Sequence, residues 1–139
     1  MSGGAFPTPI NGTSSTRLRA VATVHAAYWI VTGVWPVLSI GSFQWVTGRK
    51  HDLWLVKTVG LLLAVIGAVI GMAGRRGSTS PEIPSLALGA AATVAAVDIV
   101  YYRKGVLRWV YLVDAAGEIA LIAAWLAAWR RQSALSTPG

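Results

Sequence analysis

The chain has no cysteine and very little charge. The lack of cysteine excludes disulfide bridges, thiolate metal sites and a cysteine nucleophile. Charged residues make up only 12% of the 139 residues, about half the usual share of a globular domain. This composition is typical of a membrane protein rather than of a water-soluble domain.

Four long apolar stretches dominate the sequence. They occupy residues 20–40, 53–74, 83–102 and 109–129. Each is close to the roughly 20 residues that an α-helix needs to cross the hydrocarbon core of a bilayer. A helix of a soluble bundle shows a polar face at helical period, and these stretches do not. The sequence therefore predicts four transmembrane helices.

The connections between these stretches are short, which sets the expected topology. Helices joined by short links lie side by side and run antiparallel. We therefore expect an all-α polytopic membrane protein, an up-down-up-down bundle of four transmembrane helices with both termini on the same side. The transmembrane domain spans residues 18–131, and residues 1–17 and 132–139 are expected to be flexible tails.

Proline and tryptophan refine the ends of the helices. Pro36 should kink or end the first helix, so that residues 42–46 lie in the membrane interface. Tryptophan is enriched where membrane meets water. One boundary is expected at Trp45, Trp54 and Trp109, and the other at Trp125 and Trp129.

Basic residues occur in small groups at the ends of the stretches, although the net charge is +7. This distribution is typical of side chains that face anionic headgroups. No basic patch with interleaved aromatic residues occurs, so we expect no nucleic-acid partner. The expected partners are the lipid bilayer and either further copies of the chain, as a homo-oligomer, or a larger membrane complex.

The orientation depends on the count of basic residues on each side. Each side of the expected bundle carries six, so the positive-inside rule gives a tie. Discounting Lys57, which lies inside a predicted helix, favours cytoplasmic termini in a plasma (inner) membrane.

The second stretch carries small residues at intervals of three and four, which places them on one helix face. They are Gly60, Ala64, Gly67, Gly71 and Gly74. Small residues let membrane helices approach closely, and Gly67 and Gly71 form a GxxxG motif. The stripe predicts a helix-packing surface.

Four ionisable residues lie inside the predicted helices: Lys57, Asp98, Asp114 and Glu118. Such charges cost roughly 2.5 to 3.5 kcal/mol each at the helix centre, so they normally face the interior and pair. Residues 55–60 and 112–117 resemble an internal repeat, which places Lys57 and Asp114 at equivalent positions and makes them the expected pair. Asp98 is expected to reach Arg103 or Arg108.

Glu118 and His25 have no obvious charged partner. Glu118 lies near the middle of its helix, and we expect it to be largely protonated because desolvation disfavours a charged carboxylate. His25 lies in the first stretch, away from the acidic residues. We expect it to be a hydrogen-bonded packing residue rather than a ligand.

Several segments resemble a group of small bacterial four-helix membrane proteins without an assigned activity. These segments are Gly-Val-Trp-Pro at 33–36, the run 42–60, Val-Asp-Ile-Val-Tyr at 97–101 and Val-Tyr-Leu-Val-Asp-Ala at 110–115. The resemblance covers most of residues 18–129 and includes Lys57, Asp98 and Asp114. It implies the same fold and implies nothing about activity.

Two main hypotheses for function follow from the buried charges. The first is a non-enzymatic accessory or oligomer-forming subunit whose cluster of Lys57, Asp98, Asp114 and Glu118 fixes helix packing. The second is a proton- or ion-coupled transporter, channel or small-ligand-binding protein that uses this cluster as its site or ion pathway.

An enzyme is the third alternative. The sequence contains no nucleophile motif, no histidine spacing for a metal and no phosphate-binding loop, so we expect no metal and no cofactor. A membrane isomerase that works with two buried carboxyl groups stays open.

Overall fold

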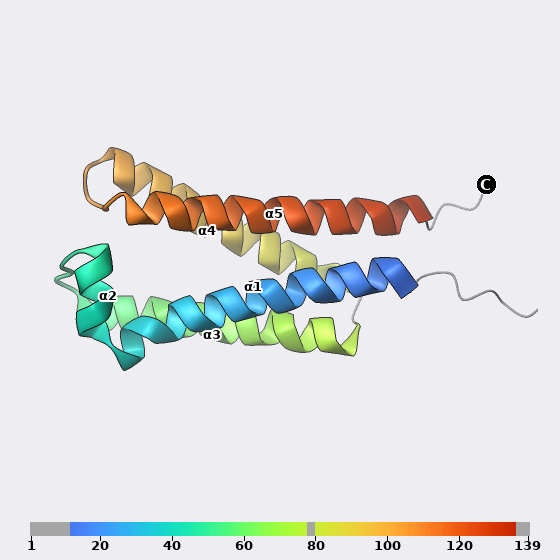
Figure 1. Cartoon of the computed structure of the whole chain (residues 1–139), viewed down its shortest axis with the longest axis horizontal. Helices are drawn as coiled ribbons and strands as arrows, with labels where there is room; N and C mark the ends of the chain where they lie inside the picture. Colours follow the sequence, from blue (N-terminus) through green and yellow to red (C-terminus); the bar gives the residue numbers. More distant parts are fainter. Residues whose placement is uncertain (1–11, 78–79, 136–139) are drawn as a thin grey trace, which may run out of the picture.

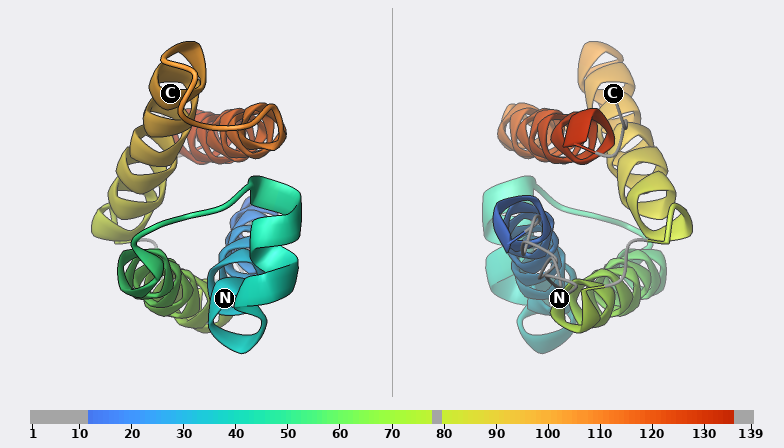
Figure 2. Two further views of the ribbon diagram at one scale, coloured as in Figure 1. Left: turned by 90° about the vertical axis from the view of Figure 1, so that its left-hand side faces the viewer. Right: turned by 90° about the vertical axis from the view of Figure 1, so that its right-hand side faces the viewer.

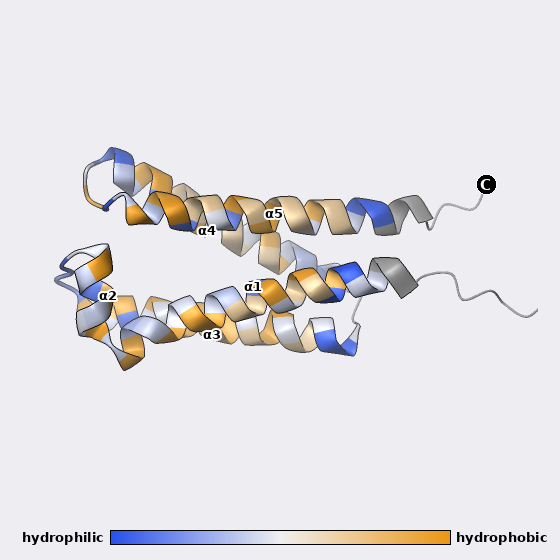
Figure 3. Ribbon diagram, viewed as in Figure 1, coloured by the Kyte–Doolittle hydropathy of each residue, from blue (hydrophilic) through white to orange (hydrophobic). Residues whose placement is uncertain are grey.

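The computed structural model describes residues 12–77 and 80–135. Within that part, all regular structure is helical. The five helices, in chain order, are α1 (Gly12–Leu38), α2 (Ile40–Thr47), α3 (Leu53–Arg76), α4 (Glu82–Arg103) and α5 (Val110–Leu135) (Figure 1). The four long helices are apolar enough to cross a membrane, which confirms the prediction of four such helices. Figure 3 shows hydrophobic residues along their length, with the strongly hydrophilic residues mainly near the ends.

The ends of the helices differ from the predicted ranges. α1 begins at Gly12, eight residues before the predicted start at Ala20, and α5 continues past Trp129 to Leu135. Both additions are polar turns that hydropathy alone does not assign to a span. Residues 1–11 and 136–139 of the predicted tails lie outside the described residues.

The first helix ends close to Pro36, as expected. α1 continues for only two residues beyond this proline, whose ring removes a backbone donor and obstructs the preceding turn. Ser39 then separates α1 from α2, with a non-helical φ of −145°. Residues 42–46 therefore belong to α2, which turns away from α1 at one end of the bundle (Figure 1).

Glycine brings α1 and α3 into very close contact. A Cβ atom added at Gly60 would lie 2.3 Å from the carbonyl oxygen of Gly33, and one added at Gly74 would lie 2.6 Å from Cβ of Ala22. The contacts advance along α3 while they go back along α1, so these two helices run in opposite directions. Only glycine permits backbones to approach this closely.

The long helices form two pairs that meet through α1. α3 packs chiefly on α1, and α4 packs chiefly on α5. α1 also contacts α5, whereas α3 touches α4 only slightly. The end-on views in Figure 2 show α1 facing α5 across the interior. The surface between α1 and α5 is therefore the place where side chains of the two pairs meet.

The tryptophans expected at the two boundaries differ in exposure. Trp45, Trp54 and Trp109 have 82%, 69% and 66% of their surfaces exposed, as side chains at a membrane boundary should. Trp125, which is expected at the other boundary, is only 2% exposed. It packs between α1 and α5 and uses its indole N–H in the interior rather than at the surface.

Candidate functional site

Three carboxyl groups meet in the interior of the bundle. Asp114 and Glu118 are one turn apart on α5, so they share the face that contacts α1. Asp98 comes from α4, and its carboxyl lies within hydrogen-bonding reach of Asp114. Asp98 and Glu118 are 5% and 1% exposed, and Asp114 is half-buried. We call these three residues the carboxyl cluster.

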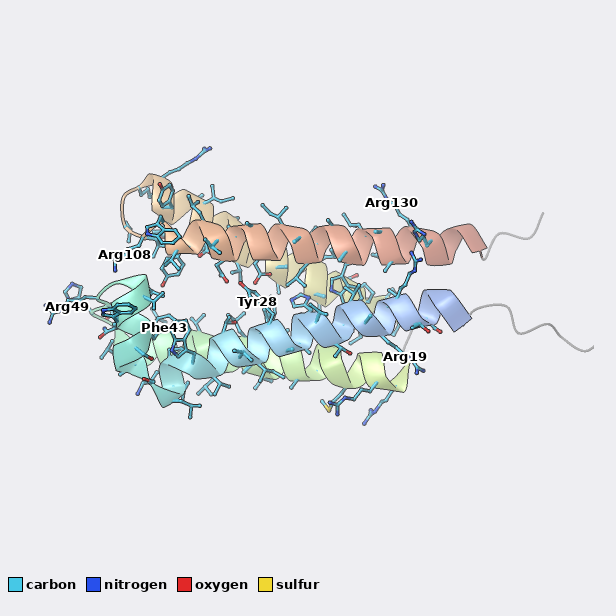
Figure 4. The ribbon with its side chains drawn as sticks, in the orientation of Figure 1. Arg19, Tyr28, Phe43, Arg49, Arg108 and Arg130 are labelled. Atoms are coloured by element: carbon cyan, nitrogen blue, oxygen red, sulfur yellow. The ribbon has the colours of Figure 1, made fainter. Side chains whose placement is uncertain are left out.

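The donors to this cluster are aromatic side chains of α1. The Tyr28 hydroxyl donates a hydrogen bond to Oδ1 of Asp114. The indole N–H of Trp29 donates to Oε1 of Glu118 at 2.7 Å. Figure 4 shows Tyr28 in the space between α1 and α5, well away from both ends of the bundle. Both donors are uncharged, so they bind the carboxyl groups without supplying a counter-charge.

Gly117 makes room for this arrangement. A Cβ atom at this position would lie 3.2 Å from the Tyr28 hydroxyl oxygen. A side chain there would crowd the hydroxyl that binds Asp114. The missing side chain at Gly117 therefore leaves the space that the Tyr28 hydroxyl needs to reach Asp114.

Lys50 supplies a cation whose charge acts on Asp98 of the carboxyl cluster. It lies in the connection between α2 and α3, and its ammonium group is 4.7 Å from the centroid of the Tyr111 ring. The Lys50 Nζ atom is also 3.5 Å from the carbonyl oxygen of Thr47. Burial lowers the pKa of Lys50, while the attraction of Asp98 acts in the opposite direction. Lys50 thus sits at the α2 end of the carboxyl cluster.

The expected pair of Lys57 and Asp114 does not form. Lys57 is half-buried on α3, a helix that packs on α1, whereas Asp114 lies on α5. Asp114 instead binds Tyr28 and approaches Asp98. The structure therefore brings together Asp98, Asp114 and Glu118 but leaves Lys57 on α3, outside the carboxyl cluster.

Asp98 also differs from the expected arrangement. It was expected to reach Arg103 or Arg108 at the membrane boundary. The structure buries it against Asp114, within the electrostatic influence of Lys50. The Arg108 guanidinium donates instead to the Trp45 carbonyl at 3.3 Å, so it holds α2 against the end of α5.

Three polar atoms of the interior have no hydrogen-bond partner among the described residues. They are Oδ2 of Asp98, Oε2 of Glu118 and Nε2 of His25. Buried polar atoms are normally satisfied, and leaving one unpaired is costly. A proton shared between Asp98 and Asp114 would give Oδ2 of Asp98 a hydrogen-bond partner. In the described part of the chain, no group of three or more acidic or histidine residues has the arrangement to hold a metal ion.

His25 is hydrogen-bonded, as the sequence predicts, but it is not remote from the acidic residues. It is fully buried, and the Trp125 indole N–H donates to its Nδ1 atom at 3.0 Å. Its ring also packs edge-to-face on Trp29 at 4.4 Å between centroids. Because Trp29 binds Glu118, a single indole separates His25 from the carboxyl cluster.

Sequence reasoning missed Tyr28, Trp29 and Lys50 as parts of the site. Tyr28 and Trp29 lie in the middle of the α1 span, where the membrane-boundary role of aromatic residues does not apply. A buried indole or phenol needs a hydrogen-bond acceptor. A tyrosine and a tryptophan in the middle of an apolar helix therefore indicate that hydrogen-bond acceptors lie nearby, and the buried carboxyl groups are such acceptors.

Comparison with known proteins adds no relative. No family model, no curated protein and no solved structure matches this chain.

Proposed function

We propose that this protein moves protons across a membrane, as a proton-coupled transporter or channel in which Asp98, Asp114 and Glu118 are the proton-binding groups. The observation that carries the proposal is the set of partners of these carboxyl groups. Asp114 binds Asp98 and the Tyr28 hydroxyl, and Glu118 binds the Trp29 indole. One oxygen of Asp98 and one of Glu118 have no partner within the described structure.

The cost of buried charge supports a role for protons. A carboxylate in the middle of a membrane helix raises the free energy of membrane insertion by roughly 2.5 to 3.5 kcal/mol, even on the insertion scales that give the lowest values. If the residues served packing alone, a buried ion pair would offset that cost. Where neutral donors are the partners instead, a proton neutralises the carboxyl, and a proton can be released again. Chains of intramembrane acidic and histidine residues commonly mark proton pathways.

The second candidate, an oligomer-forming accessory subunit, is favoured by the outer surface of α5. This helix exposes small residues at steps of four, three and four: Ala116, Ala120, Ala123 and Ala127. α3 uses the same spacing, from Gly60 to Gly74, to pack on α1. We propose that α5 packs in this way on another copy of the chain, which would also thicken the wall around a proton pathway.

The proposed placement is an up-down-up-down bundle in a bacterial inner membrane with cytoplasmic termini. The short connections support the topology, and the resemblance given above supports the location. Basic residues lie at both ends of the bundle, with Arg19 and Arg130 at one and Arg49 and Arg108 at the other (Figure 4). Lys50 is half-buried over Tyr111. It therefore adds less than an exposed lysine to the basic residues on its side of the membrane, and the six-to-six count shifts toward cytoplasmic termini.

Proton flux into liposomes tests the proposal. The purified protein is reconstituted with a pH-sensitive dye inside, and an outward potassium gradient with valinomycin supplies the driving force. Glu118→Gln should reduce flux to the leak of empty liposomes, since the amide cannot bind or release a proton. Glu82→Gln, which changes an exposed acid at the start of α4, is the matched control and should keep full flux. Wild-type flux in the Glu118→Gln protein would refute the proposal.

A further inference from the structure

The hydrogen bond from Trp125 fixes the tautomer of His25. An indole N–H is a donor only, so the Nδ1 atom that receives it carries no proton. The proton of the neutral ring is therefore on Nε2. This N–H points into a fully buried environment and has no acceptor among the described residues. His25 is thus held as a donor that lacks an acceptor.

Glu118 offers the complementary group. Its Oε2 atom is buried and has no donor in the described structure, because Trp29 binds Oε1. His25 and Glu118 both contact the Trp29 indole, His25 in an edge-to-face ring contact and Glu118 through the indole N–H. The unpaired donor of His25 and the unpaired acceptor of Glu118 therefore belong to two residues that both lie against Trp29. Contact between them, directly or through one water molecule, would satisfy both.

A cavity lies beside Trp125. It has a volume of about 50 Å³, and its wall includes Ser15, Arg19, Pro81, Trp125 and Trp129. This volume is large enough for water, and the mostly apolar wall includes the polar residues Ser15 and Arg19. Trp125 therefore contacts both sides of the proposed connection, since it lines this cavity and its N–H also binds Nδ1 of His25.

We propose that His25 is a second proton-binding group, which connects this cavity to Glu118, and that the Trp125 side chain is the gate between them. This inference rests on the proposed function of the carboxyl cluster. It adds the half of the pathway that runs from Glu118 toward the end of the bundle where Arg19 and Arg130 lie (Figure 4).

The proton transfer has two steps. When the Trp125 indole moves away from Nδ1, water in the cavity delivers a proton to this nitrogen, and the ring becomes an imidazolium. The bond between Nε2 and its hydrogen then breaks, and that proton binds Oε2 of Glu118, which changes from carboxylate to carboxylic acid. One proton has entered the ring and one has left. Reorientation of the imidazole presents its bare nitrogen to the cavity for the next proton.

The groups around His25 are consistent with this direction of transfer. α1 contributes Tyr28, α4 contributes Asp98, and α5 contributes Asp114 and Glu118, all on the side of Trp29. The cavity side carries the cation of Arg19. On α3, the described charged residues lie at its ends, at Lys57, Arg75 and Arg76. A proton that passes from His25 to Glu118 therefore moves toward the acidic residues and away from the Arg19 cation.

Nitrogen NMR of the protein labelled with ¹⁵N-histidine tests the tautomer. The chain has only two histidines, and exposed His51 gives the reference signal of a solvent-accessible imidazole. Wild-type His25 should show a protonated Nε2 and a bare, hydrogen-bonded Nδ1. Trp125→Phe removes the indole donor and should abolish this single tautomer. A protonated Nδ1 in the wild-type protein would overturn the inference.

Proton flux in the same liposomes tests the gate and the relay. His25→Phe keeps an aromatic ring without nitrogens and should reduce flux to the leak, whereas Trp125→Phe should raise flux above wild type. Trp54→Phe, which changes an exposed tryptophan, should leave it unchanged. Unchanged or lower flux in Trp125→Phe would overturn the gate.

The two proposals fail in distinguishable ways. If Glu118→Gln abolishes flux but His25→Phe keeps it, the carboxyl cluster conducts protons and the relay through His25 is wrong. If Glu118→Gln keeps wild-type flux, the proposed function itself is wrong. Each variant is compared only after gel filtration shows the wild-type elution volume. If Trp125→Phe does not fold, the wild-type tautomer and the His25→Phe flux still decide the relay.

Discussion

At the scale of single residues, the interior of this bundle binds Asp114 and Glu118 with aromatic hydrogen-bond donors instead of ion pairs. Trp29 and Tyr28 each combine a large apolar ring with one polar atom, so they can face lipid-like surroundings and still donate a hydrogen bond. A lysine in the same place would have to lose its own hydration, and that loss often exceeds the gain from pairing. Neutral donors avoid this second cost, and they leave the charge of the carboxyl group to be balanced by a proton.

Tyr28→Phe measures the strength of this arrangement. The variant removes only the hydroxyl, so Oδ1 of Asp114 loses its donor. We expect the free energy of unfolding to fall by about 1 kcal/mol, the lower end of the cost of leaving an acceptor unpaired, because Asp114 is half-buried. Thermal or denaturant unfolding in detergent micelles measures this change. Tyr102→Phe removes the same atom from an exposed ring on α4 and should change stability little; equal effects of the two variants would contradict the prediction.

The sequence predicts part of the site. It identifies Asp98, Asp114 and Glu118 because acidic residues inside apolar stretches are rare, and it correctly leaves Glu118 without a cation. The predicted pair of Lys57 and Asp114 is wrong. The internal repeat predicts equivalent positions for these residues on α3 and α5, but α3 packs on α1 whereas α5 packs chiefly on α4. Which helices are neighbours depends on packing, and the sequence of a single helix does not contain that information.

At the scale of helices, contact between α1 and α3 depends on glycine. Gly60→Ala would place a Cβ atom 2.3 Å from the carbonyl oxygen of Gly33, so the two backbones must separate. Overpacking of this kind costs about 1–3 kcal/mol, although alanine is the better helix former by roughly 1 kcal/mol. We therefore expect a net loss of stability, which thermal unfolding in micelles can measure.

Gly41→Ala is the matched control for this helix contact. Gly41 lies in α2, and a Cβ atom there meets nothing within 4 Å. The substitution should therefore be neutral or slightly stabilising, because only the preference of alanine for helical conformation remains. If Gly60→Ala also proved stabilising, the close approach of α1 and α3 would not limit the stability of the bundle.

The sequence predicts the long helices better than it predicts their ends. Length and hydropathy are sufficient for α1, α3, α4 and α5, because a span needs about 20 apolar residues whatever surrounds it. α2 has eight residues, which is too short for this signal, and only Pro36 indicated that the chain changes direction there. The first turns of α1 and the last turns of α5 are polar, so hydropathy misses them although the backbone continues as helix.

At the scale of the whole molecule, the outer stripe of α5 predicts self-association. Ala120→Leu places a bulky side chain in the middle of the exposed alanines and should prevent close packing against another helix. We expect native mass measurement in detergent to show a shift from oligomer to monomer. Ala27→Leu makes the same change on the exposed face of α1, between Val24 and Val31, and should leave the mass unchanged. A wild-type protein that is monomeric would exclude the oligomer.

The absence of cysteine makes the orientation of the bundle directly measurable. Single cysteines at Ser80, in the α3–α4 connection, and at Val106, in the α4–α5 connection, lie at exposed positions beyond opposite ends of α4. Neither substitution changes the basic residues that set orientation. With cytoplasmic termini, a membrane-impermeant maleimide added to intact cells should label Val106→Cys and label Ser80→Cys only after permeabilisation. The reverse pattern would place the termini outside, and labelling of both in intact cells would contradict a helix α4 that spans the membrane.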